Sequence, residues 1–421
     1  MAFAARVRAA LASPLLPIWL VVFLLPFGRS AELGTLLCLL GVIFLFARNP
    51  HALADHAGAR LLLWLWAAYL LAAVVSAPDA LRAGRSWGAV AGYLRYAPLG
   101  LYVCFAVRAR SRFDALVDAV AVVVALWVLD AWVQAFTGFS LGGPAQAVRV
   151  TGIFGAGNMK LGPVLASLSP FVLWAAWRRW RLRGLLVAFV FLLGPILLAG
   201  SRAAWITYGL VALAFAWHVS RSPGRFALWC VGAALVAVLA AGVAWHASPR
   251  FHDRAQRSLD VLSGSEAGIN TALSGRLDIW HVATKMYLAH PVNGVGVRDF
   301  RYAYPVYASR RDHFVTAEAC GHGEGACHPH QLLLEIATNT GTLGLLAWLA
   351  AVVLAWRHWR GVGKRAREAA FPVTVALGVT LFPLNTHLAF YSAWWGLLFW
   401  WLLTLWCAAL FLRDTQSAEA A

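Results

Sequence analysis

Residues 226–246 read FALWCVGAALVAVLAAGVAWH, a stretch that contains no Asp, Glu, Lys or Arg. About 20 apolar residues in an α-helix are long enough to cross the roughly 30 Å hydrocarbon core of a bilayer. Stretches of this kind recur along the 421 residues of the chain. They predict an all-α polytopic membrane protein, since a membrane β-barrel would show shorter segments of alternating polar and apolar residues.

The composition supports this class, because only 13% of the residues are charged, against about 25% in a typical soluble domain. The first apolar stretch follows Arg6 and Arg8, and we interpret it as an uncleaved anchor because no convincing signal-cleavage site follows it. We expect twelve spans, near residues 13–27, 31–47, 60–76, 87–107, 115–136, 161–177, 184–200, 203–219, 226–246, 330–356, 371–387 and 391–412.

The net charge of +17 follows the positive-inside rule. Basic residues gather in one alternate set of connections, which includes residues 108–112, 178–183 and 357–367. This distribution places both termini in the cytoplasm and leaves no need for a nucleic-acid partner. It divides the chain into spans one to nine (1–246), a large outer loop (247–329) and spans ten to twelve with a cytoplasmic C-terminus (330–421).

The outer loop is expected to contain short helices. One of them should start near Ser274 or Gly275 and end at Pro291, because Ser and Gly favour helix N-caps and proline ends a helix. Its apolar positions at spacings of three and four are expected to lie on the membrane surface or on the bundle; they are Leu277, Trp280, Ala283 or Thr284, and Tyr287 or Leu288. A second outer segment, Thr137–Lys160, is glycine-rich and is expected to be flexible or re-entrant.

Two cysteines of the outer loop, Cys320 and Cys327, lie seven residues apart. An oxidising exterior would allow a disulfide between them, but the sequence leaves free thiols equally open. Together with His322, His328 and His330 they have the ligand types of a zinc site. Their spacing matches no regular zinc pattern, so we expect no metal.

Two cationic residues are candidates for binding a phosphate. Arg202 lies at the outer end of a span, where it is either an interfacial anchor or a clamp, since guanidinium groups bind phosphate oxygens bidentately. Arg276 stands at the start of the expected loop helix, where the helix N-terminus also favours an anion. Two such cations suit a diphosphate. Arg95, within the fourth span, is a candidate third cation or a partner for Asp130.

His330 opens the tenth span at the junction with the outer loop. An unperturbed imidazole has a pKa of about 6.5, so its neutral form can accept a proton near neutral pH. A single interfacial histidine is more often structural, and both roles stay open. Glu335 is five residues further on and is therefore expected to orient another group rather than His330.

Two common chemistries lack their motifs. No two acidic residues are separated by a single residue, so a metal-dependent nucleotide-sugar enzyme with an Asp-x-Asp motif is disfavoured. No Walker loop is present, which disfavours ATP-driven transport.

Three ordered motifs resemble the O-antigen ligase and polymerase superfamily. His330-Gln-Leu-Leu-Leu-Glu-Ile-Ala-Thr-Asn-Thr-Gly341-Thr-Leu-Gly344 is similar to its signature, in which a histidine begins a Leu-rich helix, although Gln331 replaces the frequent Asn or Ser. Gly200-Ser-Arg202-Ala-Ala-Trp205 resembles its Ser-Arg-x-x-Trp element. Residues 275–280, followed by His290-Pro291 and Gly294-Val-Gly296, resemble its outer-loop segment. These motifs cover about 150 residues, and any one of them alone is weak.

The resemblance implies a bacterial inner-membrane glycosyltransferase of GT-C-like architecture with a periplasmic active site and no cofactor. The single large outer loop is closer to the ligases, which move O-antigen from undecaprenyl diphosphate onto a sugar hydroxyl of lipid A-core. By this resemblance His330 is the base and Arg202 and Arg276 bind the diphosphate, with Arg95, Trp280 and Glu335 as supporting residues. The expected partners are the lipid-linked donor, the lipid A-core acceptor and membrane lipids.

Other readings of the sequence remain. The same scaffold would suit an O-antigen polymerase or a protein O-oligosaccharyltransferase, which differ in the acceptor. A lipid-linked glycan transporter or flippase would use the arginines as a path, but no inverted repeat relates the two halves of the chain. A purely structural role in the membrane would not explain the ordered motifs.

Overall fold

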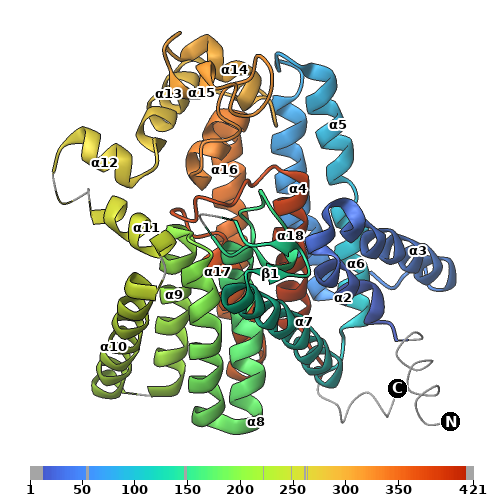
Figure 1. Ribbon diagram of the computed structural model, residues 1–421. Coiled ribbons are helices and arrows are strands. Elements are labelled where there is room, and N and C mark those ends of the chain that lie inside the picture. Colours follow the sequence, from blue (N-terminus) through green and yellow to red (C-terminus); the bar gives the residue numbers. More distant parts are fainter. Residues whose placement is uncertain are drawn as a thin grey trace.

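The computed structural model describes residues 13–53, 56–146, 149–220, 222–247, 249–259, 262 and 264–413 (Figure 1). Within these residues, seven helices are long and apolar enough to cross a membrane, so the chain is a multi-pass membrane protein. These helices are η1 with α3 (Leu25–Arg48), α4 (Ala57–Ser76), α7 (Arg110–Thr137), α8 (Leu161–Leu198), α9 (Arg202–Ser220), α10 (Pro223–Ala247) and α16 (Leu332–Gly361).

The prediction of twelve spans is not confirmed, because several of the expected spans are short or broken in the structure. The expected fourth span is divided into α5 (Ala83–Tyr93) and α6 (Tyr96–Ala106). The first contains an eight-residue helix, α2 (Leu16–Phe23). The last two correspond to α17 (Lys364–Thr380) and α18 (Ala393–Ala409), each of 17 residues.

Helix α8 covers two of the expected spans and reverses direction between them. At 38 residues it would be about 57 Å long if straight, nearly twice the thickness of the hydrocarbon core. Arg181 has a left-handed backbone, with φ of 49° and ψ of −136°. A Cβ atom added to Gly162 would lie 3.1 Å from the Cβ atom of Ala199, so the two ends of the element meet. The element is therefore an antiparallel helical hairpin.

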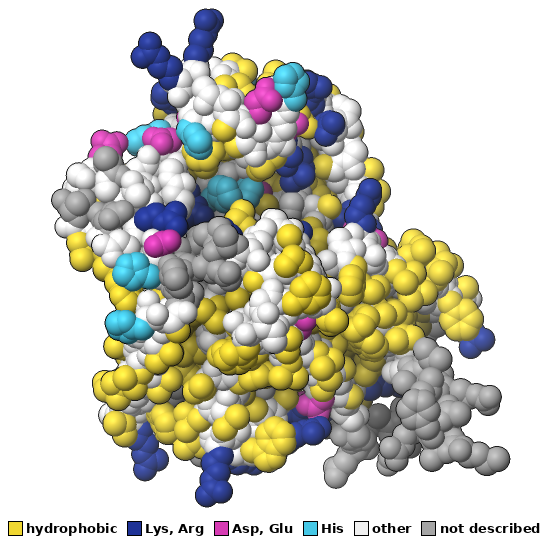
Figure 2. All heavy atoms as spheres, viewed as in Figure 1, with side chains coloured by type: hydrophobic (Ala, Val, Ile, Leu, Met, Phe, Trp, Pro, Cys, Tyr) yellow, Lys and Arg dark blue, Asp and Glu magenta, His cyan; other side chains and the backbone are white. Residues whose placement is uncertain are grey.

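The core of the bundle is built around α18, which packs on α4, α6 and α17. Every residue of this helix from Trp395 to Ala409 is buried. Helix α10 is the opposite case: Ala244 is its one buried residue among the described side chains. Its apolar side chains face outward, as expected of a helix in contact with lipid. Figure 2 shows hydrophobic side chains over the middle and lower parts of the molecule, with charged and histidine side chains above them and further Lys and Arg side chains along the lower edge.

The residues of the predicted outer loop form a small layer of helices at one end of the bundle (Figure 1). They include α11 (Pro249–Leu259), α12 (Glu266–Ala272), α13 (Arg276–Ala289), α14 (Phe300–Tyr307) and α15 (His313–Thr316). This layer has its own apolar core, in which Ile279, Val282 and Met286 of α13 contact residues such as Phe300 and Tyr304. Cys320 and Cys327 are joined by a disulfide within it.

The bounds predicted for α13 are close to those observed, but its buried face is offset from the prediction. The fully buried positions are Ile279, Val282, Ala283 and Met286, and of these only Ala283 was expected. Trp280 donates instead to the carbonyl of Pro329, the residue before His330, and Tyr287 bonds the hydroxyl of Thr342 in α16. Helix α13 also packs against the apolar core of the loop layer. The spacing of apolar residues within one helix does not reveal this second neighbour.

Helix α16 has a sharp break at Gly341, where φ is 64° and ψ is −162°. The free N–H groups after the break donate to the loop: Thr342 N lies 2.8 Å from Pro291 O, and Leu343 N lies 3.1 Å from Val292 O. A Cβ atom at Gly341 would lie 2.3 Å from Val292 O, so only glycine fits without displacement. The break separates residues 332–340, which lie under the loop, from the longer apolar part of the helix.

The glycine-rich segment before α8 is fastened to α7 by two buried polar residues. The side-chain oxygen of Gln134 accepts hydrogen bonds from the backbone N–H groups of Thr151 (2.7 Å) and Gly152 (2.8 Å). Asp130 accepts one from Leu141 N at 2.7 Å. The segment contains β1 (Phe139–Ser140), β2 (Gly143–Pro144) and η2 (Gly152–Phe154). The described residues of this segment are thus held against α7.

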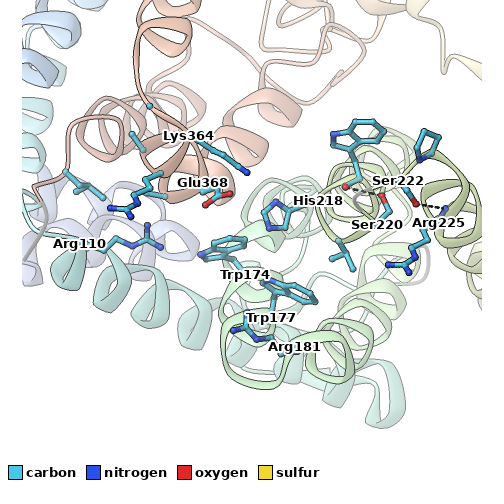
Figure 3. Close-up of a pocket in the computed structure, with 18 residues that line it drawn as sticks. Arg110, Trp174, Trp177, Arg181, His218, Ser220, Ser222, Arg225, Lys364 and Glu368 are labelled. Atoms are coloured by element: carbon cyan, nitrogen blue, oxygen red, sulfur yellow. Dashed lines mark hydrogen bonds between the residues drawn. The ribbon is translucent and has the colours of Figure 1, made fainter.

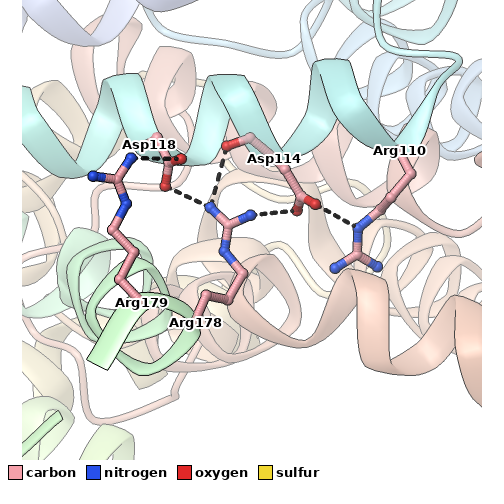
Figure 4. Close-up of polar contacts among 5 residues, drawn as sticks. All are labelled: Arg110, Asp114, Asp118, Arg178 and Arg179. Carbon is pink, nitrogen blue, oxygen red and sulfur yellow. Dashed lines mark hydrogen bonds and ion pairs between the residues drawn. The ribbon is translucent and has the colours of Figure 1, made fainter. Parts of the chain in front are cut away.

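At the other end of the bundle, α7 and α8 are joined by a network of ion pairs (Figure 4). Asp114 lies 3.0 Å from both Arg110 and Arg178. Asp118 lies 2.5 Å from Arg178 and 3.5 Å from Arg179. The N-terminal part of α7 and the middle of the α8 hairpin are therefore close together. Basic connections that were predicted to lie on one side of the membrane do share one end of the molecule.

Candidate active site

His330 stands between the loop layer and α16 in a left-handed backbone conformation, with φ of 56°. Its Nδ1 atom lies 2.7 Å from the carbonyl oxygen of Thr386. A carbonyl can only accept, so Nδ1 carries the hydrogen, and the lone pair of the neutral ring is on Nε2. Burial lowers the pKa of His330 to about 4, with the charge of Arg276 acting in the same direction. The ring is therefore neutral near pH 7, with Nε2 as its basic atom.

A second histidine supports the first. The rings of His328 and His330 have centroids 3.9 Å apart. The backbone N–H of His330 donates to Nδ1 of His328 at 3.3 Å. Burial, followed by the charge of His330, holds the pKa of His328 well below its usual value. His328 is thus a neutral acceptor that fixes the backbone of His330.

Two supporting residues hold backbone segments that meet at this centre. Trp280 Nε1 donates to the carbonyl of Pro329, one residue before His330, at 2.9 Å. Glu335 is 3% exposed and accepts from Phe390 N (3.0 Å) and Tyr391 N (3.2 Å). Glu335 therefore holds the segment that also contains Thr386, the partner of His330. This agrees with the expectation that it orients a group other than the histidine.

Gln331, the residue that departs from the family signature, is the N-cap of α16. Its side-chain oxygen accepts from Leu334 N at 2.5 Å. Asn and Ser are the usual residues for this capping position. The longer side chain makes the same bond, so the departure leaves the start of the helix unchanged.

Arg276 lies close enough to Arg202 and to His330 for its charge to act on both groups. A guanidinium nitrogen of Arg202 donates to the hydroxyl of Ser274, and another lies 3.4 Å from the hydroxyl of Ser258. Arg276 donates to the carbonyl of Leu273 at 3.1 Å. Burial lowers the pKa of Arg276 to about 10, and the charge of Arg202 contributes to this shift. Both groups stay protonated near pH 7.

Neither of these two arginines makes a salt bridge with any acidic residue that the structure describes. Their hydrogen bonds are to hydroxyl and carbonyl oxygens, which leave the positive charge uncompensated. Arg202 lines a cavity of about 250 Å³ with Arg257, Thr271 and Ser274. Two partly desolvated positive charges repel each other, and an anion bound between or beside them would offset that repulsion.

A larger cavity, of about 540 Å³, has His330 in its wall. Its wall includes His328 and His387 together with the glycine-rich segment 154–160 that precedes α8. Lys160 of this segment has its Nζ atom 4.3 Å from the ring centroid of Trp394, and burial lowers its pKa. Sequence reasoning missed Lys160 and His387 as lining residues. The sequence feature that could have indicated Lys160 is its position as a lone lysine at the end of a glycine-rich outer segment.

Arg95 does not join this group. Its Nε atom lies 3.2 Å from Glu32, and its guanidinium also donates to the carbonyl of Gly92 at 2.5 Å. The predicted pairing of Arg95 with Asp130 is wrong, since Asp130 binds the backbone of Leu141. Residues 32 and 130 lie on different helices, and one sequence gives no information on which carboxylate a buried arginine meets.

The residues considered as zinc ligands are not arranged as a metal site. Cys320 and Cys327 are bonded to each other, so they offer no thiolate. His328 and His330 use their Nδ1 atoms in hydrogen bonds to the backbone. Among the described residues, no group of three or more His, Cys, Asp or Glu side chains is placed to hold a metal ion.

A comparison with protein-family models matches residues 187–349 to the family described as O-Antigen ligase. A comparison with curated proteins found no match. The matched region runs from the second half of the α8 hairpin into α16, and it includes Arg202, Arg276 and His330. Arg95, Lys160 and His387 lie outside it. Residues 187–349 of this multi-pass membrane protein are therefore similar to the O-antigen ligase family across the region that contains the candidate active site.

Proposed function

We propose that this protein is an inverting, metal-independent glycosyltransferase that moves O-antigen from undecaprenyl diphosphate onto a sugar hydroxyl of lipid A-core. The observation that carries the proposal is a neutral histidine that lies within reach of the uncompensated charge of Arg276, with its Nε2 lone pair unused by the bond to Thr386. The charge of Arg202 lies in turn close to Arg276. The family match over the same residues supports it. The orientation expected from the basic connections puts this site on the periplasmic side of the inner membrane.

The reaction follows from the chemistry of the three groups. The acceptor hydroxyl oxygen attacks the anomeric carbon of the donor, and the bond from that carbon to the diphosphate oxygen breaks. His330 Nε2 takes the proton of the hydroxyl, a contribution of about 10²–10⁴-fold to the rate. Arg202 and Arg276 neutralise the charge that grows on the departing undecaprenyl diphosphate. Attack opposite the leaving group inverts the anomeric centre.

Each supporting residue then has a defined role. Trp280 holds the backbone directly before His330, and Glu335 holds the segment that contains Thr386. The bond to Thr386 keeps the hydrogen of the ring on Nδ1 and leaves Nε2 as the basic atom. The cavity of about 540 Å³ that reaches His330 gives a path for the acceptor sugar. No ATP is needed, because a lipid diphosphate is already an activated leaving group.

The test is transfer by purified protein from undecaprenyl-diphosphate glycan to lipid A-core, with EDTA and without nucleotide. Transfer by the wild type that is lost in His330→Ala supports the proposal. Chain growth, or transfer to a protein Ser or Thr, in place of lipid A-core would indicate a polymerase or an O-oligosaccharyltransferase on the same scaffold. Absence of transfer to any acceptor would overturn the enzymatic role.

A further inference from the structure

Another cavity lies away from His330, at the other end of the helix bundle. It has a volume of about 1330 Å³ and is bordered by the first turns of α10 and α17, the turn of the α8 hairpin and the last turn of α9 (Figure 3). Helix α9 starts at Arg202 in the candidate active site and ends at Ser220 in this cavity. Its 19 residues span about 28 Å. The two sites are thus separated by roughly the thickness of the hydrocarbon core.

The cavity has a strong excess of positive charge. Arg110, Arg181, Arg225, Lys364 and Arg365 line it, and Glu368 is the one acidic residue among the lining residues. Arg110 is paired with Asp114. The side chains of Arg225, Lys364 and Arg365 make no salt bridge with a residue that the structure describes. These three cations are free to bind an anion that comes from outside the chain.

The same cavity has an aromatic wall. Trp174, Trp177 and Trp217 line it, and the ring of His218 lies between Trp174 and Phe371, with centroids 5.3 Å and 4.3 Å away. Tryptophan is enriched where a membrane protein meets the headgroup region, because its ring is apolar and its N–H is polar. Cations and tryptophans at one depth therefore match the boundary between headgroups and acyl chains.

The wall of the cavity continues into an exposed apolar surface. Trp217 is 63% exposed, and it lies one turn from Leu213, which is 44% exposed. On the neighbouring helix, Leu228 is 70% exposed and lies one turn beyond Arg225. A soluble anion would not contact this apolar surface, whereas the acyl chains of a lipid would cover it.

We propose that this cavity binds an anionic phospholipid, with its phosphate beside Arg225, Lys364 and Arg365 and its acyl chains along α9 and α10. The helix N-termini at Pro223 and Lys364 add partial positive charge at the same place. Charge complementarity selects an anionic headgroup over a zwitterionic one, and the apolar continuation selects a lipid over free phosphate. The proposal does not depend on the transfer reaction.

The experiment is native mass spectrometry of the full chain in micelles that contain equal amounts of phosphatidylglycerol and phosphatidylcholine. The wild type should retain phosphatidylglycerol preferentially. The triple variant Arg225→Gln, Lys364→Gln and Arg365→Gln should lose about 100-fold of that preference, since each cation beside an anionic lipid contributes roughly fivefold. The control, Arg357→Gln with Arg360→Gln, removes two exposed arginines from the nearby end of α16 that do not line the cavity.

Several results would overturn the proposal: equal retention of both lipids by the wild type, an unchanged preference in the triple variant, or an equal loss in the control. Displacement of the lipid by inorganic phosphate would identify a site for a free anion instead. If the triple variant fails to fold, the single variant Arg225→Gln replaces it, because the side chain of Arg225 is exposed. It should still lower the preference about fivefold.

Discussion

His330 and Thr386 are 56 residues apart in the chain, yet Nδ1 of the histidine lies 2.7 Å from the carbonyl oxygen of the threonine. This one bond fixes the tautomer of the ring and leaves Nε2 as the basic atom. It also ties the start of α16 to the segment that precedes α18. The chemistry proposed for the site depends on this relationship.

Replacement of His330 by alanine is expected to lower the transfer rate by about 10²–10⁴-fold, the usual contribution of a general base. Donor binding should change little, because the diphosphate is assigned to the arginines. Transfer rate and donor affinity would be measured on the same preparation. A variant that is correctly folded and transfers at the wild-type rate would remove the base role.

Replacement of Arg202 or Arg276 by lysine is expected to weaken donor binding by about 10- to 100-fold, because lysine keeps the charge but loses the bidentate geometry. Binding of the lipid-diphosphate donor would be titrated directly. Arg311→Lys, a change at an exposed position of the loop layer, is the matched control and should bind normally. Unchanged affinity in both active-site variants would contradict the clamp.

The pH dependence of the reaction should reflect the lowered pKa of His330, about 4. A base works in its unprotonated form, and kcat/KM reports the pKa of the free protein, so kcat/KM should rise through about pH 4 and stay level towards pH 8, instead of rising near the ordinary value of about 6.5. Arg276→Gln removes a positive charge that lowers this pKa. The rising limb of that variant should move to higher pH, whereas a limb near 6.5 in the wild type would show that the ring is not desolvated as described.

Glu335→Ala is expected to destabilise the protein by about 2–5 kcal/mol, since two buried backbone N–H groups, those of Phe390 and Tyr391, lose their acceptor. Transfer should also slow, because the same segment holds Thr386. Thermal unfolding in detergent would measure the stability. The control Glu266→Gln, at an exposed position of α12, should change neither the stability nor the transfer rate. An equal effect in that control would show that the bonds to Phe390 and Tyr391 are not the cause.

Gly341→Ala is expected to lower stability strongly, because its Cβ atom would lie 2.3 Å from Val292 O and its φ is 64°. Gly209→Ala is a matched control within α9, where an added Cβ atom has no neighbour within 4 Å. Alanine there should be neutral or stabilising by up to about 1 kcal/mol, because it favours the helix. Equal stability of the two variants would show that the break in α16 is not required.

The membrane class and the positions of the main apolar helices could be read from composition and hydropathy, because the bilayer imposes a minimum length on every spanning helix. The number of spans could not be predicted in this way. The 17-residue helices α17 and α18 are near the lower limit of that length, and the break between α5 and α6 depends on packing. Hydropathy windows report apolar length and carry no information on how a helix is divided.

The candidate site residues, too, were predicted only in part from the sequence. The sequence by itself determined an apolar multi-pass chain, its basic connections and the ordered motifs that contain Arg202, Arg276 and His330. Only the tertiary structure decided that Arg276 lies near both other residues, that Thr386 sets the histidine tautomer, and that Arg95 pairs with Glu32 and not with Asp130. The reason is physical: hydropathy and helix spacing are local properties of the chain, whereas a hydrogen bond or an ion pair between residues far apart depends on how the helices pack against one another.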